Sequence, residues 1–181
     1  RMADLVDDLI TFADEVRIDG FTDLVLLGMG GSSLGPLVLG RVFKTSPGYL
    51  HLHVLDSTLP GKIRAVENQV NLRSTLFLIS SKSGTTIEPL RLMAFFRKRL
   101  DDIGVENPDA RFIVATDPGS SLERMANERG FKRVFDTPVD VGGRFSVLSR
   151  FGLIPAALIG LDLEKLLGPA TAMAQACRES D

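Results

Sequence analysis

Apolar residues along the chain gather in short runs that alternate with segments of helical periodicity. Four aliphatic, β-branched or aromatic runs, each bounded by turn residues, predict buried strands at 24–27, 50–55, 75–79 and 112–115. Helical spacing predicts helices at 33–43, 61–70, 87–100 and 121–129, and Val134 with Phe135 predicts a fifth strand. Because alternating strands and helices need crossover connections, the pattern predicts an α/β fold, a three-layer αβα sandwich around a mainly parallel five-stranded sheet. Ligands are then expected at the carboxyl ends of the strands.

Further helical stretches flank these elements. Apolar residues from Leu5 to Val16 recur at helical spacing before Gly20, and a segment rich in Leu and Ala predicts one or two helices over 146–177 with a break around 160–162. We therefore divide the chain into a lead helix (1–20), a ligand-binding domain (21–165) and a C-terminal helix (166–181). Arg1 before Met2, and an end at Asp181 after a polar helical stretch, are typical of a segment of a longer polypeptide.

Composition narrows the class of function. The 181 residues are 44% hydrophobic and 24% charged, which fits one globular domain with a substantial core. Acidic and basic residues intermix to a formal net charge of -2, which argues against nucleic acid and anionic membranes as partners. The longest apolar stretch, 153–161, contains Pro155 and is too short to span a bilayer. Cys177 is the only cysteine, so we expect no internal disulfide and a cytoplasmic, small-molecule function.

The first candidate turn directly follows the first strand. It reads Gly28-Met29-Gly30-Gly31-Ser32-Ser33-Leu34-Gly35-Pro36 and opens a helix. Glycines let the main chain approach a ligand, and a helix start offers unpaired N–H groups to an anion. A dinucleotide-binding fingerprint is a competing interpretation: Gly28 and Gly30 supply only two of its three glycines, while Asp56 occupies a plausible later position.

The second candidate turn, Ser80-Ser81-Lys82-Ser83-Gly84-Thr85-Thr86, follows the third strand. Its hydroxyls, together with backbone N–H groups and a helix start, suit a phosphomonoester, which has three acceptor oxygens and nearly two negative charges. A structural interpretation stands beside this one, because Thr85 and Glu88 have the spacing of a capping box. Capping would occupy Thr85 and leave Ser81, Ser83 and Thr86 for an anion. The spacing of the turn excludes a Walker loop.

The third candidate turn, Val141-Gly142-Gly143-Arg144-Phe145-Ser146, lies between the fifth strand and the final helices. Its paired glycines allow another close approach of the main chain. Arg144 is either a fixed cation over a developing oxyanion or one partner of a surface salt bridge.

Together the three turns resemble the phosphoglucose isomerase family, whose first domain is a sugar isomerase (SIS) domain of flavodoxin-like fold. The first is similar to Gly-Ile-Gly-Gly-Ser-x-Leu-Gly-Pro and differs at Met29. The second is similar to Ser-Lys-Thr-Phe-Thr-Thr-x-Glu-Thr, with Ser83, Gly84 and Pro89 as its departures. The third fits Gly-Gly-Arg-Phe/Tyr-Ser, although Val139 replaces an acidic or small polar residue and Arg150 a small one. These departures, with the run of residues 151–158, resemble bacterial isomerases fused behind a transaldolase.

This resemblance implies a cofactor-free aldose-ketose isomerase of glycolysis and gluconeogenesis, dimeric when complete, which interconverts glucose 6-phosphate and fructose 6-phosphate through an enediolate. It implies that the sugar contacts Gly31 and Ser32. The phosphate would contact Ser81, Lys82, Ser83 and Thr86, with Lys82 acting mainly through its backbone, and the other expected binding positions are Gly84, Thr85 and Gly143. Arg144 is the implied catalytic residue, an electrostatic stabiliser of the enediolate and not a proton-transfer group.

The proton-transfer groups that the family uses, a glutamate, a histidine and a lysine, have no counterparts in this sequence. After Arg144 the chain offers only Glu164, Glu179 and Lys165, in contexts unlike the later family motifs. We therefore expect this chain to bind substrate but to turn over little of it alone. His51 and His53 lie on one side of the second strand without an evident third ligand, so no metal site is expected.

Two other functions stay open. A SIS-type sensor would bind a sugar phosphate and regulate a partner without chemistry, although such a sensor has no need of the Gly-Gly-Arg turn. A nicotinamide-dependent enzyme would instead bind a dinucleotide at the first turn.

Overall fold

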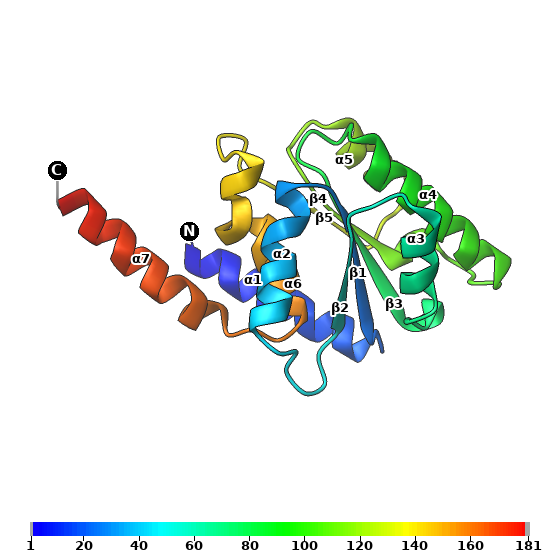
Figure 1. Ribbon diagram of the computed structural model, residues 1–181, viewed down its shortest axis with the longest axis horizontal. Helices are drawn as coiled ribbons and strands as arrows, with labels where there is room; N and C mark the ends of the chain where they lie inside the picture. Colours follow the sequence, from blue (N-terminus) through cyan, green and yellow to red (C-terminus); the bar gives the residue numbers. More distant parts are fainter. Residues whose placement is uncertain (1, 180–181) are drawn as a thin grey trace.

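The computed structural model describes residues 2–179 and contains five strands that alternate with helices (Figure 1). The strands are β1 (Asp23–Gly28), β2 (His51–Leu55), β3 (Thr75–Ser80), β4 (Phe112–Thr116) and β5 (Arg133–Asp136). The α-helices are α1 (Met2–Ile18), α2 (Gly31–Val42), α3 (Pro60–Glu67), α4 (Ile87–Asp102), α5 (Ser121–Arg129), α6 (Arg150–Leu158) and α7 (Leu163–Glu179). Three 3₁₀ turns complete the order: η1 (Leu72–Ser74), η2 (Asp109–Arg111) and η3 (Gly143–Leu148). All five predicted strands are confirmed, as is the break between the last two helices.

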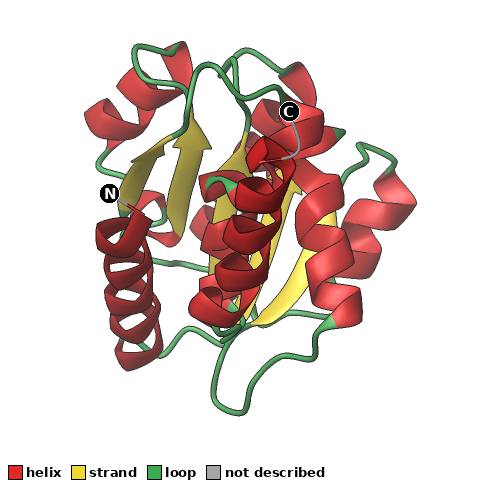
Figure 2. Cartoon of the chain, turned by 90° about the vertical axis from the view of Figure 1, so that its left-hand side faces the viewer, coloured by secondary structure: helices red, strands yellow, loops and turns green. Residues whose placement is uncertain are grey.

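The strands form one sheet in the order β2-β1-β3-β4-β5, and every neighbouring pair is parallel. In Figure 2 the visible strand arrows accordingly rise toward one edge. Register places Gly28 of β1 opposite Ser80 of β3, so these two strands end level with each other. The predicted α/β sandwich is therefore confirmed, with a sheet that is entirely parallel.

Two apolar cores cover the two faces of the sheet. Alternate side chains of β1 point into different cores. Leu24 and Leu26 pack in the core with α1 and α6, and Val25 and Leu27 pack in the core with α4 and α5. This division follows from the alternation of side chains along a strand. Figure 1 shows the same layers, with α1, α2 and α6 on one side of the sheet and α3, α4 and α5 on the other.

The edge strand β2 differs from its prediction. The run 50–55 was expected to be a buried strand, but His51 is exposed and residues 52–54 are only half-buried, whereas Leu55 is fully buried. The reason is topological: β2 has a sheet neighbour on only one side, and an apolar run alone does not distinguish an edge strand from a central one.

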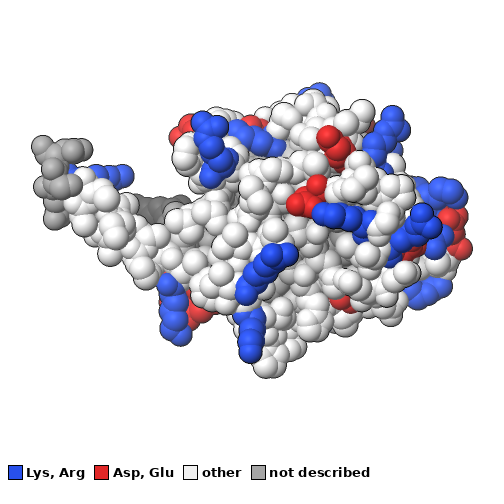
Figure 3. Space-filling view, in the orientation of Figure 1, with Lys and Arg blue, Asp and Glu red and all other residues white. Residues whose placement is uncertain are grey.

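Charged side chains gather toward the α3 and α4 side of the face seen in Figure 3, where both signs intermix. The centre of that face is largely uncharged. None of the helices in residues 2–179 combines the length and the hydropathy that crossing a membrane requires.

Candidate active site

The three candidate turns lie at the carboxyl edge of the sheet, around the ends of β1 and β3. The helix after β1 covers one face of the sheet and the helix after β3 covers the other. Neighbouring parallel strands whose following helices diverge in this way create a crevice, and ligands of doubly wound α/β proteins bind there. The topology thus directs attention to the turns after Gly28 and Ser80.

The first turn presents backbone N–H groups at the start of α2. Gly30, with a φ of 56°, is the N-cap, and no side chain caps the helix. The Gly30 carbonyl accepts from the N–H groups of Ser33 and Leu34, whereas the N–H groups of Gly30 and Gly31 have no acceptor within residues 2–179. Ser80 Oγ donates to the Ser32 carbonyl at 3.1 Å and ties this turn to the end of β3. An anion at this helix start would find two free donors and the positive end of the helix dipole.

The third turn contacts the first through a pair of glycines. A Cβ placed on Gly31 would lie 2.3 Å from both the carbonyl carbon and the carbonyl oxygen of Gly143, and 2.8 Å from the Arg144 nitrogen. Such distances leave no room for a side chain, so glycine at position 31 is what permits the approach. Ser146, which is buried, donates from Oγ to the Gly143 carbonyl at 2.6 Å and holds the turn in shape. The structure therefore brings Gly31, Ser32, Gly143 and Arg144 together.

In the second turn the hydroxyls bond to one another. Ser81 Oγ, in a residue only 2% exposed, donates to Thr86 Oγ1 at 3.2 Å, and the hydroxyls of Ser83 and Thr85 are 2.9 Å apart. The predicted capping box is wrong, because α4 begins at Ile87 with Thr86 as its N-cap and no side chain caps it. Thr85 lies one residue too early and bonds Ser83 instead. The four hydroxyls form two pairs beside an uncapped helix start, an arrangement whose donors can reorient toward an oxyanion.

Gly84 serves a packing role in the same turn. It has a φ of +68°, and a Cβ there would lie 2.9 Å from the Cβ atoms of Ser120 and Leu122. Ser121 Oγ donates to the Gly84 carbonyl at 3.2 Å. Gly84 thus holds the turn against the start of α5, which accounts for glycine at a position where the family pattern has phenylalanine.

Lys82 connects three neighbouring turns through its ammonium group. Its Nζ donates to both carboxylate oxygens of Asp117, at 2.9 and 2.8 Å, and to the carbonyls of Pro138 and Val139, each at 3.0 Å. Thr137 Oγ1 also donates to Asp117, at 2.7 Å. The side chain is thereby occupied, and the Lys82 carbonyl accepts from the Asp117 N–H and from Thr116 Oγ1. The backbone N–H is the part of Lys82 that stays available to an anion. Sequence reasoning missed Asp117 and Thr137, which directly follow β4 and β5 and lie two residues beyond the corresponding predicted strands.

Arg144 is exposed beside the contact between Gly31 and Gly143. Its guanidinium carbon lies 5.1 Å from the centre of the Phe145 ring, and no carboxylate within the described residues pairs with it. The alternative of a surface salt bridge therefore finds no partner in this part of the chain. Arg150 is tied down, since Nη1 donates to the Asp136 carbonyl at 2.6 Å, while its buried Nε has no partner among the described residues.

The acidic and basic residues after Arg144 lie outside this site. Glu164 stands at the start of α7, which begins near the lower edge of the molecule in Figure 1, whereas α2 begins near the upper edge. Lys165 donates to Asp162 at 2.9 Å, and this hydrogen bond raises the pKa of Lys165, which keeps the lysine cationic and unsuited to act as a base. The side chain of Glu179 lies outside the described residues.

Of the two histidines of β2, one lies beside a carboxylate of β1 and the other is exposed. His53 Nε2 lies 3.0 Å from Asp23 Oδ1, across the β1–β2 pair, and His51 is exposed. No group of three or more potential metal ligands of the His, Cys, Asp or Glu type occurs within the described part of the chain.

Comparison with known proteins places these features in a family. A sequence model described as phosphoglucose isomerase matches residues 5–181. The chain is 42% identical over 163 residues to a glucose-6-phosphate isomerase of Prochlorococcus marinus (strain NATL2A), covering 89% of this chain and 31% of that protein. It is 34% identical over 178 residues to one of Rubrobacter xylanophilus, covering 94% of this chain and 41% of that protein.

Two solved structures share the fold and part of the sequence. A hypothetical protein of Thermus thermophilus superposes with a TM-score of 0.81 at 37% identity, over 93% of this chain and 41% of that one. A glucose-6-phosphate isomerase of Chlamydia trachomatis gives a TM-score of 0.77 at 29% identity, over 86% of this chain and 29% of that one. The chain thus spans between about a third and two fifths of the length of the curated relatives it matches.

Proposed function

The chain belongs to the phosphoglucose isomerase family, and from this premise we propose that it is the substrate-binding portion of an enzyme that interconverts glucose 6-phosphate and fructose 6-phosphate. The observation that carries the proposal is the contact of Gly31 with Gly143. This contact brings the backbone of Arg144 to a helix start whose first two N–H groups have no acceptor among the described residues, one strand away from the hydroxyl-rich turn. A phosphorylated sugar needs these elements at one edge of the sheet.

In this proposal the phosphate binds the second turn. Ser81, Ser83, Thr85 and Thr86 exchange their mutual hydrogen bonds for bonds to phosphate oxygens, and the start of α4 supplies backbone N–H groups and a favourable dipole. The Lys82 backbone and Gly84 complete the turn. The sugar then extends toward Gly31, Ser32 and Gly143, where the first and third turns meet.

Arg144 supplies the electrostatic part of the chemistry. When a proton moves between C2 and C1 of the open-chain sugar, negative charge develops on the enediolate oxygens. The Arg144 guanidinium forms no ion pair with the described carboxylates and can stabilise that charge. Proton transfer itself needs a base and a ring-opening acid. These groups belong, in our proposal, to parts of a complete enzyme that this chain does not contain, whether in the same polypeptide or in a second subunit.

The outer face of α2 is apolar, and we expect another protein segment or subunit to cover it in the complete enzyme. Leu34, Val38 and Val42, spaced four residues apart, are 56%, 56% and 66% exposed and form one apolar stripe. Dimer formation and fusion behind a transaldolase are the forms of neighbour that the family resemblance suggests.

Substitution of Thr86 by valine tests the phosphate assignment, because valine keeps the shape of threonine and removes its hydroxyl. We expect glucose 6-phosphate to bind about tenfold more weakly, the effect of one lost hydrogen bond to a charged group. Isothermal titration calorimetry measures the affinity. Thr171→Val on α7, far from the three turns, is the matched control and should leave affinity unchanged. Unchanged affinity in Thr86→Val would refute the phosphate site.

Turnover by this chain alone tests whether it binds the substrate without supplying the proton-transfer groups. We expect the chain to bind glucose 6-phosphate and to form negligible fructose 6-phosphate in a coupled assay, because the glutamate, histidine and lysine that the family uses for proton transfer have no counterparts in this sequence. Robust turnover would contradict this expectation. A SIS-type sensor predicts the same pair of results, but it also predicts that the complete natural protein is inactive. Stabilisation by NAD and not by glucose 6-phosphate, in a thermal-shift titration, would instead favour a nicotinamide enzyme.

A further inference from the structure

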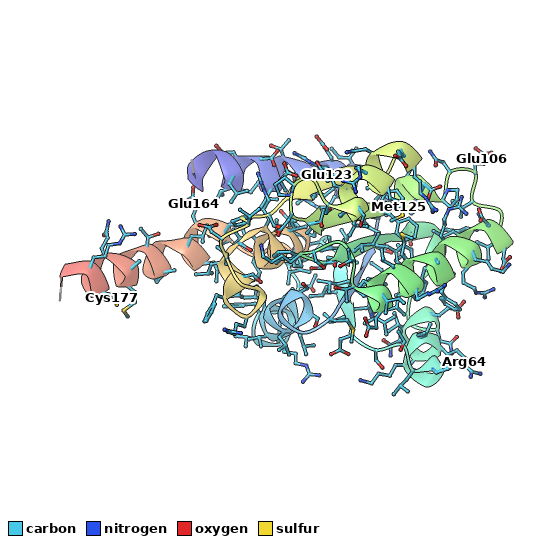
Figure 4. All side chains as sticks on the ribbon, turned by 90° about the horizontal axis from the view of Figure 1, so that it is seen from above. Arg64, Glu106, Glu123, Met125, Glu164 and Cys177 are labelled. Atoms are coloured by element: carbon cyan, nitrogen blue, oxygen red, sulfur yellow. The ribbon has the colours of Figure 1, made fainter. Side chains whose placement is uncertain are left out.

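A cavity lies at the edge of the sheet where the strands begin, opposite the three turns. Its volume is about 670 Å³, and its lining comes from segments that directly precede β1, β3, β4 and β5. The loop 104–107 after α4 forms part of its wall and includes Glu106, which Figure 4 labels at the end of the molecule opposite α7. The charged and aromatic residues of the lining are Asp19, Phe21, Arg73, Glu106, Arg111 and Lys132.

Three cations converge on this cavity from three different segments. Arg73 lies in η1 before β3, Arg111 closes η2 before β4, and Lys132 immediately precedes β5. Two of them share one aromatic ring, since the Arg111 guanidinium carbon lies 5.0 Å and Lys132 Nζ lies 5.9 Å from the centre of Phe21. Phe21 is only 8% exposed, so it forms a fixed floor beneath these charges.

Two of the cations also have structural partners. Lys132 Nζ donates to Asp19 Oδ2 at 2.5 Å, and Arg73 Nη2 donates to the Ile103 carbonyl at the end of α4. A cation at a helix carboxyl end is an ordinary stabilising feature. Arg111 is different, because its guanidinium stacks on Phe21 but has no hydrogen-bond acceptor and no carboxylate partner among the side chains that the structure describes.

The charge balance of the lining is positive. Arg73, Arg111 and Lys132 face two carboxylates, those of Asp19 and Glu106, and one of these is already bonded to Lys132. Two guanidinium groups carry ten N–H donors, of which the described residues use one. Guanidinium forks together with an ammonium group match a tetrahedral oxyanion, which accepts several charge-assisted hydrogen bonds at once. We propose that this cavity is a binding site for a phosphate-bearing small molecule, separate from the three turns at the carboxyl edge.

The two edges of the sheet can be probed independently. Phe21 lies just before β1 and the Gly-rich turn just after it, so the whole length of a strand separates the cavity from the sugar-phosphate site. Amide signals of residues 104–107 and Lys132 report on the cavity, and those of Gly31 and 81–86 report on the turns. Absence of binding at one of these sites is therefore no evidence against binding at the other.

The test is a titration of the ¹⁵N-labelled chain with millimolar inorganic phosphate, monitored by ¹H–¹⁵N correlation spectra. A parallel titration with sodium chloride at equal ionic strength is the control. We expect saturable shifts at 104–107 and Lys132 that chloride does not produce. Arg111→Gln should weaken this binding at least about tenfold, since it removes the unpaired guanidinium. Asp19→Asn should tighten it about threefold or more, because it removes a carboxylate and frees Lys132.

Arg64→Gln on the exposed outer side of α3 is the matched control and should not change the cavity signals. Shifts that chloride reproduces, or an Arg111→Gln chain that binds as the unaltered chain does, would overturn the proposal. If Arg111→Gln does not fold, Asp19→Asn decides: tighter binding supports the site, and equal or weaker binding removes it.

Discussion

Replacement of Gly31 by alanine is expected to destabilise the chain by about 3 kcal/mol and to remove measurable binding of glucose 6-phosphate. The new Cβ would overlap the Gly143 carbonyl at 2.3 Å and the Arg144 nitrogen at 2.8 Å. Because both obstacles are backbone, no side-chain rotation relieves the clash, and the cost falls at the upper end of what overpacking usually imposes. The first and third turns must separate, and Arg144 moves away from the start of α2.

Denaturant unfolding measures the loss of stability, and calorimetric titration with glucose 6-phosphate measures the loss of binding. Gly61→Ala is the control, because Gly61 lies in α3 with nothing within 4 Å of an added Cβ. There alanine should stabilise the chain by up to about 1 kcal/mol through its better helix propensity. A Gly31→Ala chain with unchanged stability and affinity would mean that the two turns do not meet in solution.

The layers of the fold could be predicted because they follow from local patterns. Fully buried runs such as 75–79 have neighbours on both sides and on both faces, and this makes their sequence continuously apolar. The run 50–55 was expected to be equally buried, but it contains His51 and His53 and forms an edge strand. Its position at the edge depends on the crossover connections, which periodicity does not encode.

The candidate site, like the fold, could be predicted only in part. Each turn could be located from its glycines and hydroxyls at a strand end, but the contacts between turns join residues far apart in the sequence. Nothing local indicates that Gly31 touches Gly143 or that Ser80 donates to the Ser32 carbonyl. The capping box failed for a related reason, because the hydroxyl that could cap α4 bonds a neighbouring serine. A competing side-chain partner is invisible in a spacing rule.

Substitution of Lys82 by methionine is expected to cost about 3 kcal/mol of stability. Lys82 and Asp117 have side chains only 26% and 22% exposed, so the change leaves a mostly buried carboxylate with Thr137 as its remaining hydrogen-bond donor. The carbonyls of Pro138 and Val139 lose their donor as well. Because the loop beyond Val139 leads to the Gly-Gly-Arg turn, we also expect glucose 6-phosphate to bind about tenfold more weakly.

Asp117→Asn distinguishes this clamp from direct phosphate binding by the ammonium group. If Lys82 Nζ were a phosphate ligand, Asp117→Asn would release it and affinity would hold or rise. If Lys82 is a clamp between turns, both variants lose stability and affinity in parallel. Lys98→Met is the control for the loss of stability. The ion pair of Lys98 with Asp102 lies on the surface of α4, where the lysine side chain is 74% exposed. Loss of this pair should therefore reduce the free energy of unfolding by less than about 0.5 kcal/mol. A Lys82→Met chain that loses affinity but no more stability than Lys98→Met would assign the ammonium to the phosphate. The second and third turns would then be connected through the first turn, by the hydrogen bond from Ser80 to the Ser32 carbonyl and by the contact of Gly31 with Gly143.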